Sequence, residues 1–232
     1  FLGDGSTLRQ KIFRYMVKRC AGVVTLSLDE KHFLESKFPH LRGYVEHIPF
    51  GIDFDFFRSG REQIEDRVMA VGLDPDRDWK TLVEAMKGVN VPLVLTTRES
   101  RVEKLRPLPA NVSVCQFSAH DLIRAYDKSA IVVVPLNTSH GVNDAMGCSA
   151  LFEAMAMGKA IIATRTRAME SYVTHGENGL LVEEGDAEAL REAINKLLSD
   201  TSLRETLSKN ALAYAHEHLD IQKRTAELAR FF

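Results

Sequence analysis

Glu153 is the residue whose surroundings most clearly suggest chemistry. It lies in the segment 151–157, where its helical neighbours are apolar residues such as Leu151, Phe152 and Met155. A carboxylate among such neighbours costs free energy unless a partner satisfies it. Two ligand hydroxyl groups, such as the diol of a ribose, would be a suitable partner. Pairing with a neighbouring Lys or Arg is the alternative.

Gly147 stands at the junction between a loop and the helix that carries this carboxylate. A glycine at that point lets a ligand approach the backbone closely. The free N–H groups at the start of the helix would face an anion, and the helix dipole favours negative charge there. The segment that begins at Gly147 therefore suits a phosphate group.

Strands and helices must position these residues, and they alternate from Arg67 onward. Segments such as 131–134 and 160–163 are apolar on both faces, as in a parallel sheet covered by helices on both sides. We therefore predict an α/β fold with a doubly wound parallel sheet, Rossmann-like in its connections. The predicted strands are 68–72, 92–96, 112–115, 131–135, 160–164 and 179–182, and the predicted helices are 78–88, 119–128, 147–157, 167–174, 186–199, 201–217 and 219–232.

Ligands of such sheets bind beyond the carboxyl ends of the strands. Gly72 and Arg77 follow the first of these strands, and Arg98 follows the second. The Arg77 guanidinium would match phosphate oxygens with two parallel hydrogen bonds. The alternative for Arg77 is a surface ion pair with Asp76 or Asp78. Arg98 could reach a phosphate or face water.

The first 48 residues form a separate β-α-β unit, with helices at 8–20 and 29–38 and strands at 22–27 and 44–48. Pro49 and Gly51 break this unit, and charged residues follow, so that 49–66 is predicted to be an interdomain connection. The helix at 8–20 is basic along part of its surface. This helix could contact anionic lipid, or its apolar face could pack against its own strand, and the sequence leaves both alternatives open.

Several functions are disfavoured by composition. The formal net charge of −2 argues against non-specific nucleic-acid binding. No apolar run approaches the roughly 20 residues that span a bilayer. Cys20, Cys115 and Cys148 show no CxxC spacing and are expected to be reduced in a cytoplasmic protein. The eight histidines form no clustered ligand spacing, so no metal site is predicted.

Four ordered motifs cover roughly residues 21–200. They are HIPFGID at 47–53, VGLDPDRDWKTLVEA at 71–85, LFEAMAMGKAIIAT at 151–164 and GENGLLVEEGD at 176–186. Together they resemble the hinge and the donor-binding lobe of family-four (group 1) glycosyltransferases, which have the two-lobed GT-B fold. The resemblance implies an enzyme that moves a sugar from a nucleotide diphosphate-sugar to an acceptor.

The resemblance also assigns residues. A Glu on the donor-site helix binds the nucleotide ribose, and that position is Glu153. A basic residue that binds the diphosphate, usually Lys, aligns with Arg77, while a second one, usually Arg, is replaced by Leu73. Arg77 and Glu153 are thus the expected catalytic residues. Gly72 lies beside the diphosphate position, and the family contacts the base through main chain near Ser118.

The position that touches the sugar departs from the family. The usual pattern is Glu-x7-Glu, and counting back from Glu153 reaches Ala145. Asp144 would serve if the loop shifts by one residue. Otherwise the backbone N–H groups of Met146, Gly147 and Cys148 are expected to hold the sugar and the distal phosphate.

The resemblance divides the chain into four parts. Residues 1–48 are expected to be a remnant of the acceptor lobe, 49–66 the connection, 67–215 the donor domain, and 216–232 a helix that returns toward the first lobe. The missing part of that lobe, the nucleotide-sugar donor, and an acceptor glycan, lipid or small molecule are the expected partners. A retaining hexosyltransferase without cofactor is favoured, cytoplasmic or peripheral at the membrane. A non-catalytic nucleotide-sugar-binding module and another GT-B-like enzyme, such as a sugar-nucleotide epimerase or a phosphorylase, are the alternatives.

Overall fold

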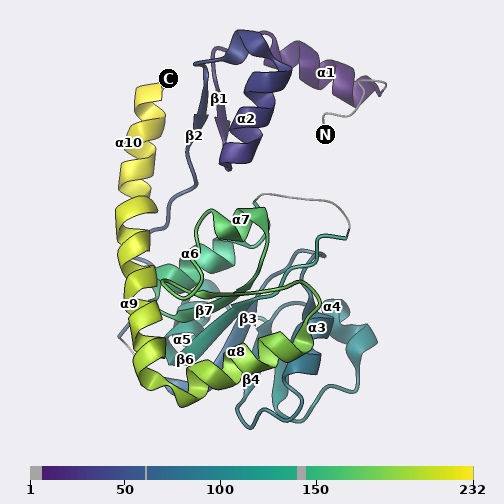
Figure 1. The fold of residues 1–232 in the computed structure, drawn as a ribbon, viewed down its shortest axis with the longest axis vertical. Coiled ribbons are helices and arrows are strands. Elements are labelled where there is room, and N and C mark those ends of the chain that lie inside the picture. Colours follow the sequence, from purple (N-terminus) through teal and green to yellow (C-terminus); the bar gives the residue numbers. More distant parts are fainter. Residues whose placement is uncertain (1–6, 61, 140–144, 232) are drawn as a thin grey trace. The chain divides into compact units, whose positions relative to one another are not determined.

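A computed structural model of the chain describes residues 7–60, 62–139 and 145–231 (Figure 1). The chain divides into two compact units. Unit 1 takes the residues up to 51 together with those from 222 onward, and unit 2 takes residues 52–221. The chain therefore passes between the units twice, once before Ile52 and once after Ile221.

Unit 2 is built on a six-stranded sheet in the order β5-β4-β3-β6-β7-β8, with every neighbouring pair parallel. The predicted doubly wound sheet is confirmed. Strand order runs outward from β3 to β5 on one side and from β6 to β8 on the other, so it reverses between β3 and β6. The strands are β3 (Glu65–Val71), β4 (Leu93–Thr96), β5 (Val112–Cys115), β6 (Ser129–Val134), β7 (Ala160–Thr164) and β8 (Leu180–Val182).

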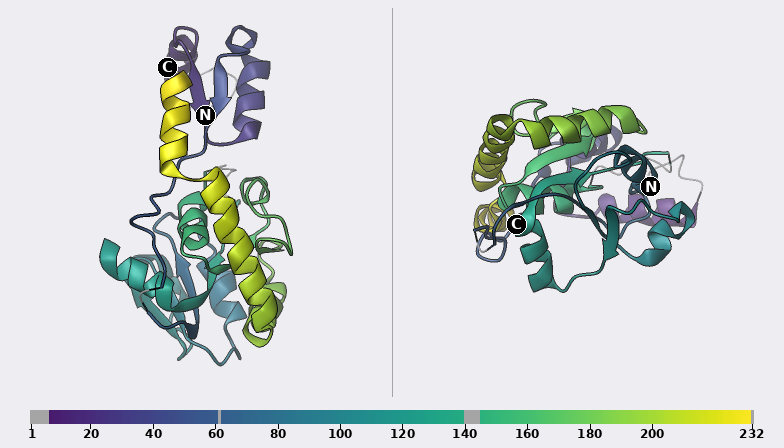
Figure 2. Two further views of the ribbon diagram at one scale, coloured as in Figure 1. Left: turned by 90° about the vertical axis from the view of Figure 1, so that its left-hand side faces the viewer. Right: turned by 90° about the horizontal axis from the view of Figure 1, so that it is seen from below.

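Helices cover both faces of this sheet (Figure 2). On one face α3 packs against α8, and on the other α5 and α6 contact the central strands while α9 packs against α6 and β7. The helices are α3 (Trp79–Ala85), α4 (Glu99–Val102), α5 (Ala119–Lys128), α6 (Cys148–Ala156), α7 (Arg167–Glu170), α8 (Ala187–Ser199) and α9 (Thr201–His218), with a short 3₁₀ turn η2 (Glu103–Leu105) after α4.

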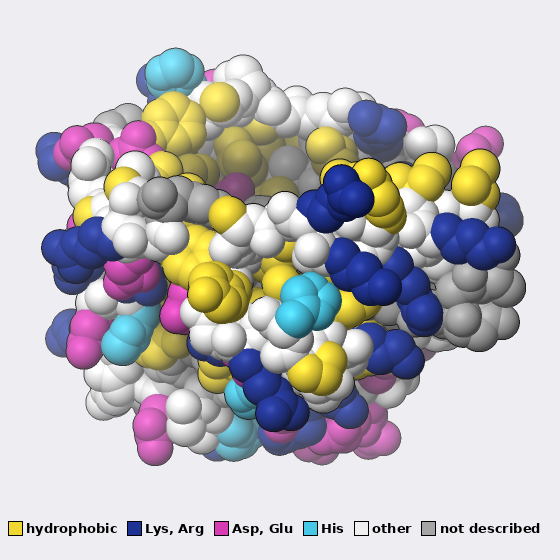
Figure 3. All heavy atoms as spheres, turned by 90° about the horizontal axis from the view of Figure 1, so that it is seen from above, with side chains coloured by type: hydrophobic (Ala, Val, Ile, Leu, Met, Phe, Trp, Pro, Cys, Tyr) yellow, Lys and Arg dark blue, Asp and Glu magenta, His cyan; other side chains and the backbone are white. Residues whose placement is uncertain are grey.

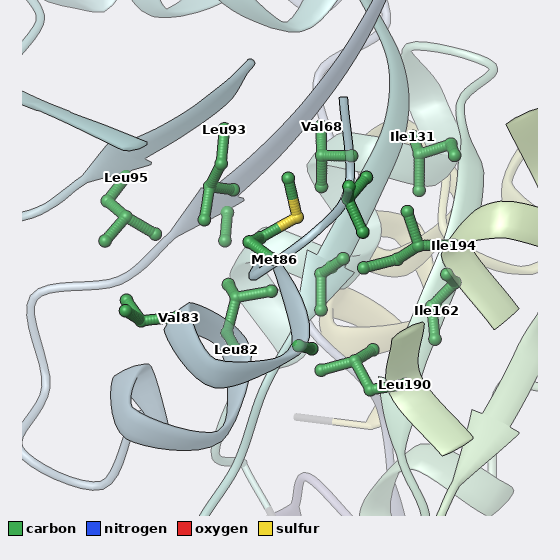
Figure 4. Close-up of a cluster of buried hydrophobic side chains, with 14 of the residues drawn as sticks. Val68, Leu82, Val83, Met86, Leu93, Leu95, Ile131, Ile162, Leu190 and Ile194 are labelled. Atoms are coloured by element: carbon green, nitrogen blue, oxygen red, sulfur yellow. The ribbon is translucent and has the colours of Figure 1, made fainter. Parts of the chain in front are cut away.

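The main core lies between the sheet and the α3–α8 face (Figure 4). Leu82 of α3 and Ile194 of α8 are fully buried against strand residues such as Val68 and Ile131. Full burial of one such aliphatic side chain stabilises the fold by about 1.5–3 kcal/mol. Met69, next to Val68, is fully buried as well. Since neighbouring strand residues point to opposite faces, both faces are buried, as the two-sided apolar pattern predicts.

Three predicted helices end early: α1 (Leu8–Val17) at Val17 instead of residue 20, α3 at Ala85 instead of residue 88, and α7 by the widest margin. The pattern predicts a helix over 167–174, whereas α7 ends at Glu170. The Asn178 side chain explains the early end, because its Oδ1 accepts from Thr174 N (2.8 Å) and its Nδ2 donates to Tyr172 O (3.0 Å). These bonds satisfy backbone groups that a longer helix would otherwise have used. The short helix α4 is an element that the sequence pattern does not reveal.

Unit 1 holds two parallel strands, β1 (Val23–Thr25) and β2 (Val45–His47). They are accompanied by α1 (Leu8–Val17), α2 (Leu28–Lys37), the 3₁₀ turn η1 (Pro39–Leu41) and α10 (Ile221–Phe231). A small cluster forms its core: Val17, Leu34, Phe38, Leu41 and Val45. Gly22 is required beside β1, because a Cβ there would lie 2.7 Å from the ring of Phe231. The last turn of α10 thus belongs against this strand.

Helix α1 has two apolar faces. Phe13 and Val17 pack on the core of unit 1, which confirms packing of this helix against its own unit. A second set of apolar side chains is exposed, and Figure 3, which shows the face of the molecule that carries α1, has Lys and Arg side chains gathered beside hydrophobic ones. The exposed residues of α1 and the segment after it are Leu8, Lys11, Ile12, Tyr15, Met16, Lys18 and Arg19.

The two ends of unit 2 are hydrogen-bonded to each other. Ile52 N donates to Leu219 O (2.6 Å), and Ile221 N donates to Ile52 O (3.1 Å). The segment at Ile52 therefore pairs in parallel with the residues that join α9 to α10. Both passages of the chain between the units start from this one point of unit 2.

Lys159 is buried at the start of β7, with only 2% of its surface exposed. Its Nζ donates to the backbone oxygen of Asp127 (2.7 Å), and the Asp127 carboxylate accepts from the backbone N–H groups of Gly60 and Glu62. Burial lowers the pKa of Lys159 from 10.5 to about 8, against the opposing effect of Asp127. The folded chain therefore loses this proton at a lower pH than the unfolded chain does.

The free energy of unfolding should consequently rise with pH between the two pKa values of Lys159. In that window the unfolded state holds one more proton than the folded state, which corresponds to a slope of about 1.4 kcal/mol per pH unit. Below about pH 8 both states are protonated and the slope vanishes. Urea denaturation of the wild type and of Lys159→Met at several pH values would measure it. The expected result is a rise in the wild type that the variant lacks, and parallel curves would contradict it.

Candidate functional site

The candidate site lies at the carboxyl edge of the sheet, between β3 and β6. Strand order reverses there, and a crevice outside the carboxyl ends of the strands at such a point is where open α/β sheets bind ligands. Two loops meet at this point: residues 72–78 follow β3, and the segment after β6 leads to α6. They supply most of the residues that the sequence singles out.

The loop after β3 is fastened across the end of β6. Asp78 N donates to Pro135 O (3.2 Å), and Asn137 N donates to Asp76 O (2.8 Å). Asp78 also caps α3, since its side chain accepts from Thr81 N (3.0 Å). Arg77 is thereby held beyond the ends of the two central strands, where its backbone bridges Leu136.

The Arg77 side chain runs over Gly72. A Cβ at position 72 would lie 2.2 Å from Arg77 Nε, so only glycine leaves room for this arrangement. Arg77 is 8% exposed, and its Nε donates to Asp74 Oδ2 (2.9 Å). The expected alternative, a surface pair with Asp76 or Asp78, is therefore wrong in both its partner and its exposure.

Arg77 also has an unsatisfied donor. Its Nη1 is buried and makes no hydrogen bond to any residue that the structure describes. Buried polar groups nearly always have a partner, and a cationic donor left alone is costly. An anionic ligand in this crevice would supply the missing acceptor.

Helix α6 begins one residue later than the sequence suggests. Gly147 is its N-cap with φ +79°, a left-handed conformation that favours glycine, and a Cβ there would approach Val134 to 3.0 Å. The amide of Cys148, predicted to bind a phosphate, instead donates to Ala145 O (3.3 Å). Glycine offers no side-chain cap, so the amides left at this helix start are those of Ser149 and Ala150.

Glu153 is partly buried and hydrogen-bonded within the chain. Its Oε2 accepts a hydrogen bond from the hydroxyl group of Tyr126, a residue of α5 (2.8 Å). Burial raises the pKa of Glu153, while the Tyr126 hydrogen bond and the charge of Arg77 act in the opposite direction. Among the described residues Glu153 forms no ion pair with Lys or Arg, so the alternative predicted for it is not observed. Because the charge of Arg77 acts on Glu153, the two groups lie near each other at this edge of the sheet.

The neighbouring strand end adds two buried hydroxyl groups. Thr96 ends β4, Thr97 follows it, and neither Oγ1 has a hydrogen-bond partner in the described part of the chain. Arg98, next in sequence, is exposed at the start of α4. Ser118 is the N-cap of α5, where its hydroxyl accepts from Asp121 N (3.3 Å) and donates to Asp121 Oδ2 (2.7 Å). Its side chain thus serves the helix, which leaves only its main chain for a ligand.

The remaining predicted residues are placed as follows. Asp144 lies outside the described residues. The side chains of Met146 and Cys148 are buried, so only their backbone could face a ligand. Leu73, which replaces the family's usual Arg, is 53% exposed beside Gly72. Arg77 is therefore the one basic residue that the loop 72–78 brings to the end of β3.

Sequence reasoning missed Tyr126 and Asp74, the two direct partners of the predicted pair. The composition of α5 gave a signal for the first, because a tyrosine on its apolar side needs a partner for its hydroxyl when buried. Asp74 precedes Arg77 by three residues, so a turn in the loop can bring the two side chains together. This edge of the sheet thus offers an acceptor for hydroxyl groups at Glu153 and donors for an anion at Arg77 and the start of α6.

Two further kinds of feature are absent from the described residues. No group of three or more His, Cys, Asp or Glu residues in that part of the chain is arranged to hold a metal ion. None of the helices described has the length and apolar character that crossing a bilayer requires.

Curated proteins with related sequences are glycosyltransferases. The chain is 33% identical over 81 residues to the lipopolysaccharide core biosynthesis glycosyltransferase LpsE of Rhizobium meliloti, covering 35% of this chain and 23% of that protein. It is 32% identical over 126 residues to the D-inositol 3-phosphate glycosyltransferase of Acidothermus cellulolyticus, covering 51% and 27%. The aligned segments thus span only about a quarter of these relatives.

Solved structures share the fold. Sucrose-phosphate synthase from Thermosynechococcus elongatus superposes with a TM-score of 0.79 at 22% identity, covering 99% of this chain and 63% of that one. HepE of Anabaena, in complex with UDP-glucose, gives 0.78 at 19% identity, covering 95% and 66%. The family model of group 1 glycosyl transferases matches residues 73–213, more than half of the chain and the whole of the crevice after Gly72. The chain belongs to the group 1 glycosyl transferases.

Proposed function

We propose that unit 2 binds a nucleotide diphosphate-sugar in the crevice between β3 and β6, and that the protein transfers a hexose from it with retention of configuration. The observation that carries this proposal is the buried Arg77, whose Nη1 has no partner among the described residues and whose charge acts on Glu153. A guanidinium suits phosphate oxygens, and a carboxylate suits the hydroxyls of a ribose. The complex of HepE with UDP-glucose supports this class of ligand.

The proposed chemistry is stabilisation of the leaving group. Negative charge grows on the diphosphate as the bond to the sugar breaks, and preorganised donors lower the barrier most where charge develops. Arg77 and the amides of Ser149 and Ala150 are the donors available near this point. Glu153 would fix the nucleoside end, so that the diphosphate lies against these donors. The sugar itself would lie near the loop after β6, with Asp144 and the backbone of Met146 and Gly147 as proposed contacts.

A thermal-shift panel of UDP-, GDP- and ADP-sugars tests the proposal. Any ligand that binds only the folded state raises the melting temperature, by an amount that grows with its concentration relative to its Kd. We expect one nucleotide series to stabilise the chain while the other two do not. A shift with none of the three at millimolar concentration would refute nucleotide-sugar binding by this chain.

Transfer itself is a separate question, because the chain spans only part of its relatives. A binding nucleotide sugar that releases no nucleotide with any acceptor would favour the non-catalytic module. Interconversion of the sugar without an acceptor would instead indicate an epimerase. Release of nucleotide only with an acceptor glycan, lipid or small molecule would establish the transferase.

The exposed face of α1 supports a peripheral location at a cytoplasmic membrane surface. Its apolar residues stand beside Lys11, Lys18 and Arg19, and Arg19 lies over the Tyr15 ring at 4.4 Å. Basic residues flanking an exposed apolar face suit an anionic lipid surface. Co-sedimentation with phosphatidylglycerol vesicles but not with phosphatidylcholine vesicles is expected, and a triple Lys11→Glu, Lys18→Glu, Arg19→Glu variant should lose it. Equal recovery with both lipids would contradict the assignment.

A further inference from the structure

Tyr126 is a fully buried tyrosine that contacts the candidate site. It is 0% exposed in the last turn of α5, and its hydroxyl donates to Glu153 Oε2 at 2.8 Å. The hydroxyl of a buried tyrosine normally has a partner, and here that partner is the carboxylate proposed to hold the ligand. The contact joins α5 to α6 across the face of the sheet that these two helices cover.

This hydrogen bond has a fixed direction. Burial and the neighbouring Glu153 raise the pKa of Tyr126 well above its ordinary value, so the phenol keeps its proton throughout the physiological range. Because the phenol keeps its proton, it donates to Oε2 throughout this range, and Oε2 always has this partner. The other carboxylate oxygen, Oε1, makes no hydrogen bond to the described residues, and Glu153 as a whole is only partly buried.

The phenol also opposes protonation of the carboxylate. Burial favours the neutral acid at Glu153, whereas the Tyr126 hydrogen bond and the Arg77 charge favour the carboxylate. In the described part of the chain these are the titratable groups that face Glu153: Tyr126 from α5 and Arg77 from the loop before α3. Arg77 also pairs with Asp74, whose carboxylate accepts a hydrogen bond from Arg77 Nε. Among the described residues, the Tyr126 hydroxyl therefore hydrogen-bonds to Glu153 alone.

We propose that Tyr126 is a positioning residue of the donor site, which holds Glu153 Oε2 so that the carboxylate stays ionised and turns Oε1 toward the ligand hydroxyls. The inference rests on the proposed function of the crevice and adds a residue that touches no ligand itself. It implies that the affinity for the donor falls at acid pH, because a protonated Glu153 loses acceptor capacity. It also implies that the pH at which affinity falls depends on Tyr126.

Calorimetric titration with UDP-glucose, or with the GDP- or ADP-glucose that the panel selects, tests this between about pH 5 and pH 8. A nucleotide sugar is the suitable probe, because its diphosphate does not titrate in that range. Tyr126→Phe should bind roughly tenfold more weakly at neutral pH, as expected when a charged group loses a hydrogen bond. Its affinity should also begin to fall at a higher pH than that of the wild type.

Two further variants separate positioning from packing. Tyr172→Phe removes a hydroxyl from another buried ring, one that packs edge-on against Phe152 of α6 at 4.8 Å, and should keep the wild-type profile. Glu153→Gln should show no fall in affinity at acid pH. The double variant Tyr126→Phe, Glu153→Gln should bind no more weakly than Glu153→Gln alone. Additive losses in this cycle would show that Tyr126 acts independently of Glu153.

The outcomes distinguish this inference from the function on which it rests. If the wild type binds no nucleotide sugar, or if Glu153→Gln binds as the wild type does, the proposed donor site is wrong. In the other case, binding by the wild type requires Glu153 and weakens at acid pH, but Tyr126→Phe has the same affinity and pH dependence as Tyr172→Phe. The donor site then stands, and the role proposed for Tyr126 is wrong.

Discussion

Glu153→Ala is expected to weaken nucleotide binding roughly 10- to 150-fold, the range that corresponds to about 1.5–3 kcal/mol for hydrogen bonds to a charged group. The loss should be the same for the nucleoside as for its diphosphate, because the carboxylate is proposed to hold the ribose. Isothermal titration with both ligands measures it. Glu192→Ala, which removes an exposed carboxylate from α8, is the matched control and should bind normally.

The fold should tolerate this change only in part. Alanine at 153 leaves the buried Tyr126 hydroxyl without its acceptor, at a cost of about 1–3 kcal/mol of stability. Glu153→Gln keeps an oxygen for that hydroxyl and should be closer to the wild type in melting temperature while still weakening the ligand. If both variants bind every nucleotide with unchanged affinity, Glu153 lies outside the site.

Arg77→Ala is expected to weaken binding of the nucleoside diphosphate by a similar factor, roughly 10- to 150-fold, and to leave the nucleoside nearly unaffected. The reason is that its guanidinium faces the position proposed for phosphate, with Nη1 awaiting an acceptor. Arg77→Lys should recover only part of the affinity, because a single ammonium cannot form two parallel hydrogen bonds. Arg101→Ala, on the exposed surface of α4, is the control.

Gly72→Ala tests the same position without removing the charge. The added methyl group would occupy the space of the Arg77 side chain and force the guanidinium away from Asp74. Diphosphate affinity should fall toward that of Arg77→Ala, while the backbone at position 72, which has no positive φ, accommodates alanine. Equal losses for nucleoside and diphosphate in these variants would contradict the role assigned to Arg77.

The sheet could be predicted because each strand carries its own signal. Runs such as Ile131–Val134 are apolar on both faces, and a parallel sheet between two helical layers is the arrangement that requires this. The position of the crevice follows from the strand order. Glu153 was recognisable because a carboxylate among Leu151, Phe152 and Met155 contradicts its surroundings.

The partners within the site could not be predicted in the same way. Tyr126 meets Glu153 across 27 residues of sequence, and only the packing of α5 beside α6 brings them together. A shift of one residue in the start of a helix decides which amides can bind a ligand. The amide of Cys148, for example, donates to Ala145 O. Asp74 rather than Asp76 or Asp78 pairs with Arg77 because the loop crosses β6 and turns the side chain inward. These contacts depend on three-dimensional register, which periodicity does not contain.

The adjacency of Ile52 and Ile221 makes unit 2 a closed insert in the polypeptide. Its first and last residues are already hydrogen-bonded neighbours, so a peptide linker of a few residues would join them without disturbing the sheet. Circular permutation should therefore be feasible, with new termini opened at an exposed turn such as Gly185. The same adjacency would let unit 2 be excised or grafted as one piece.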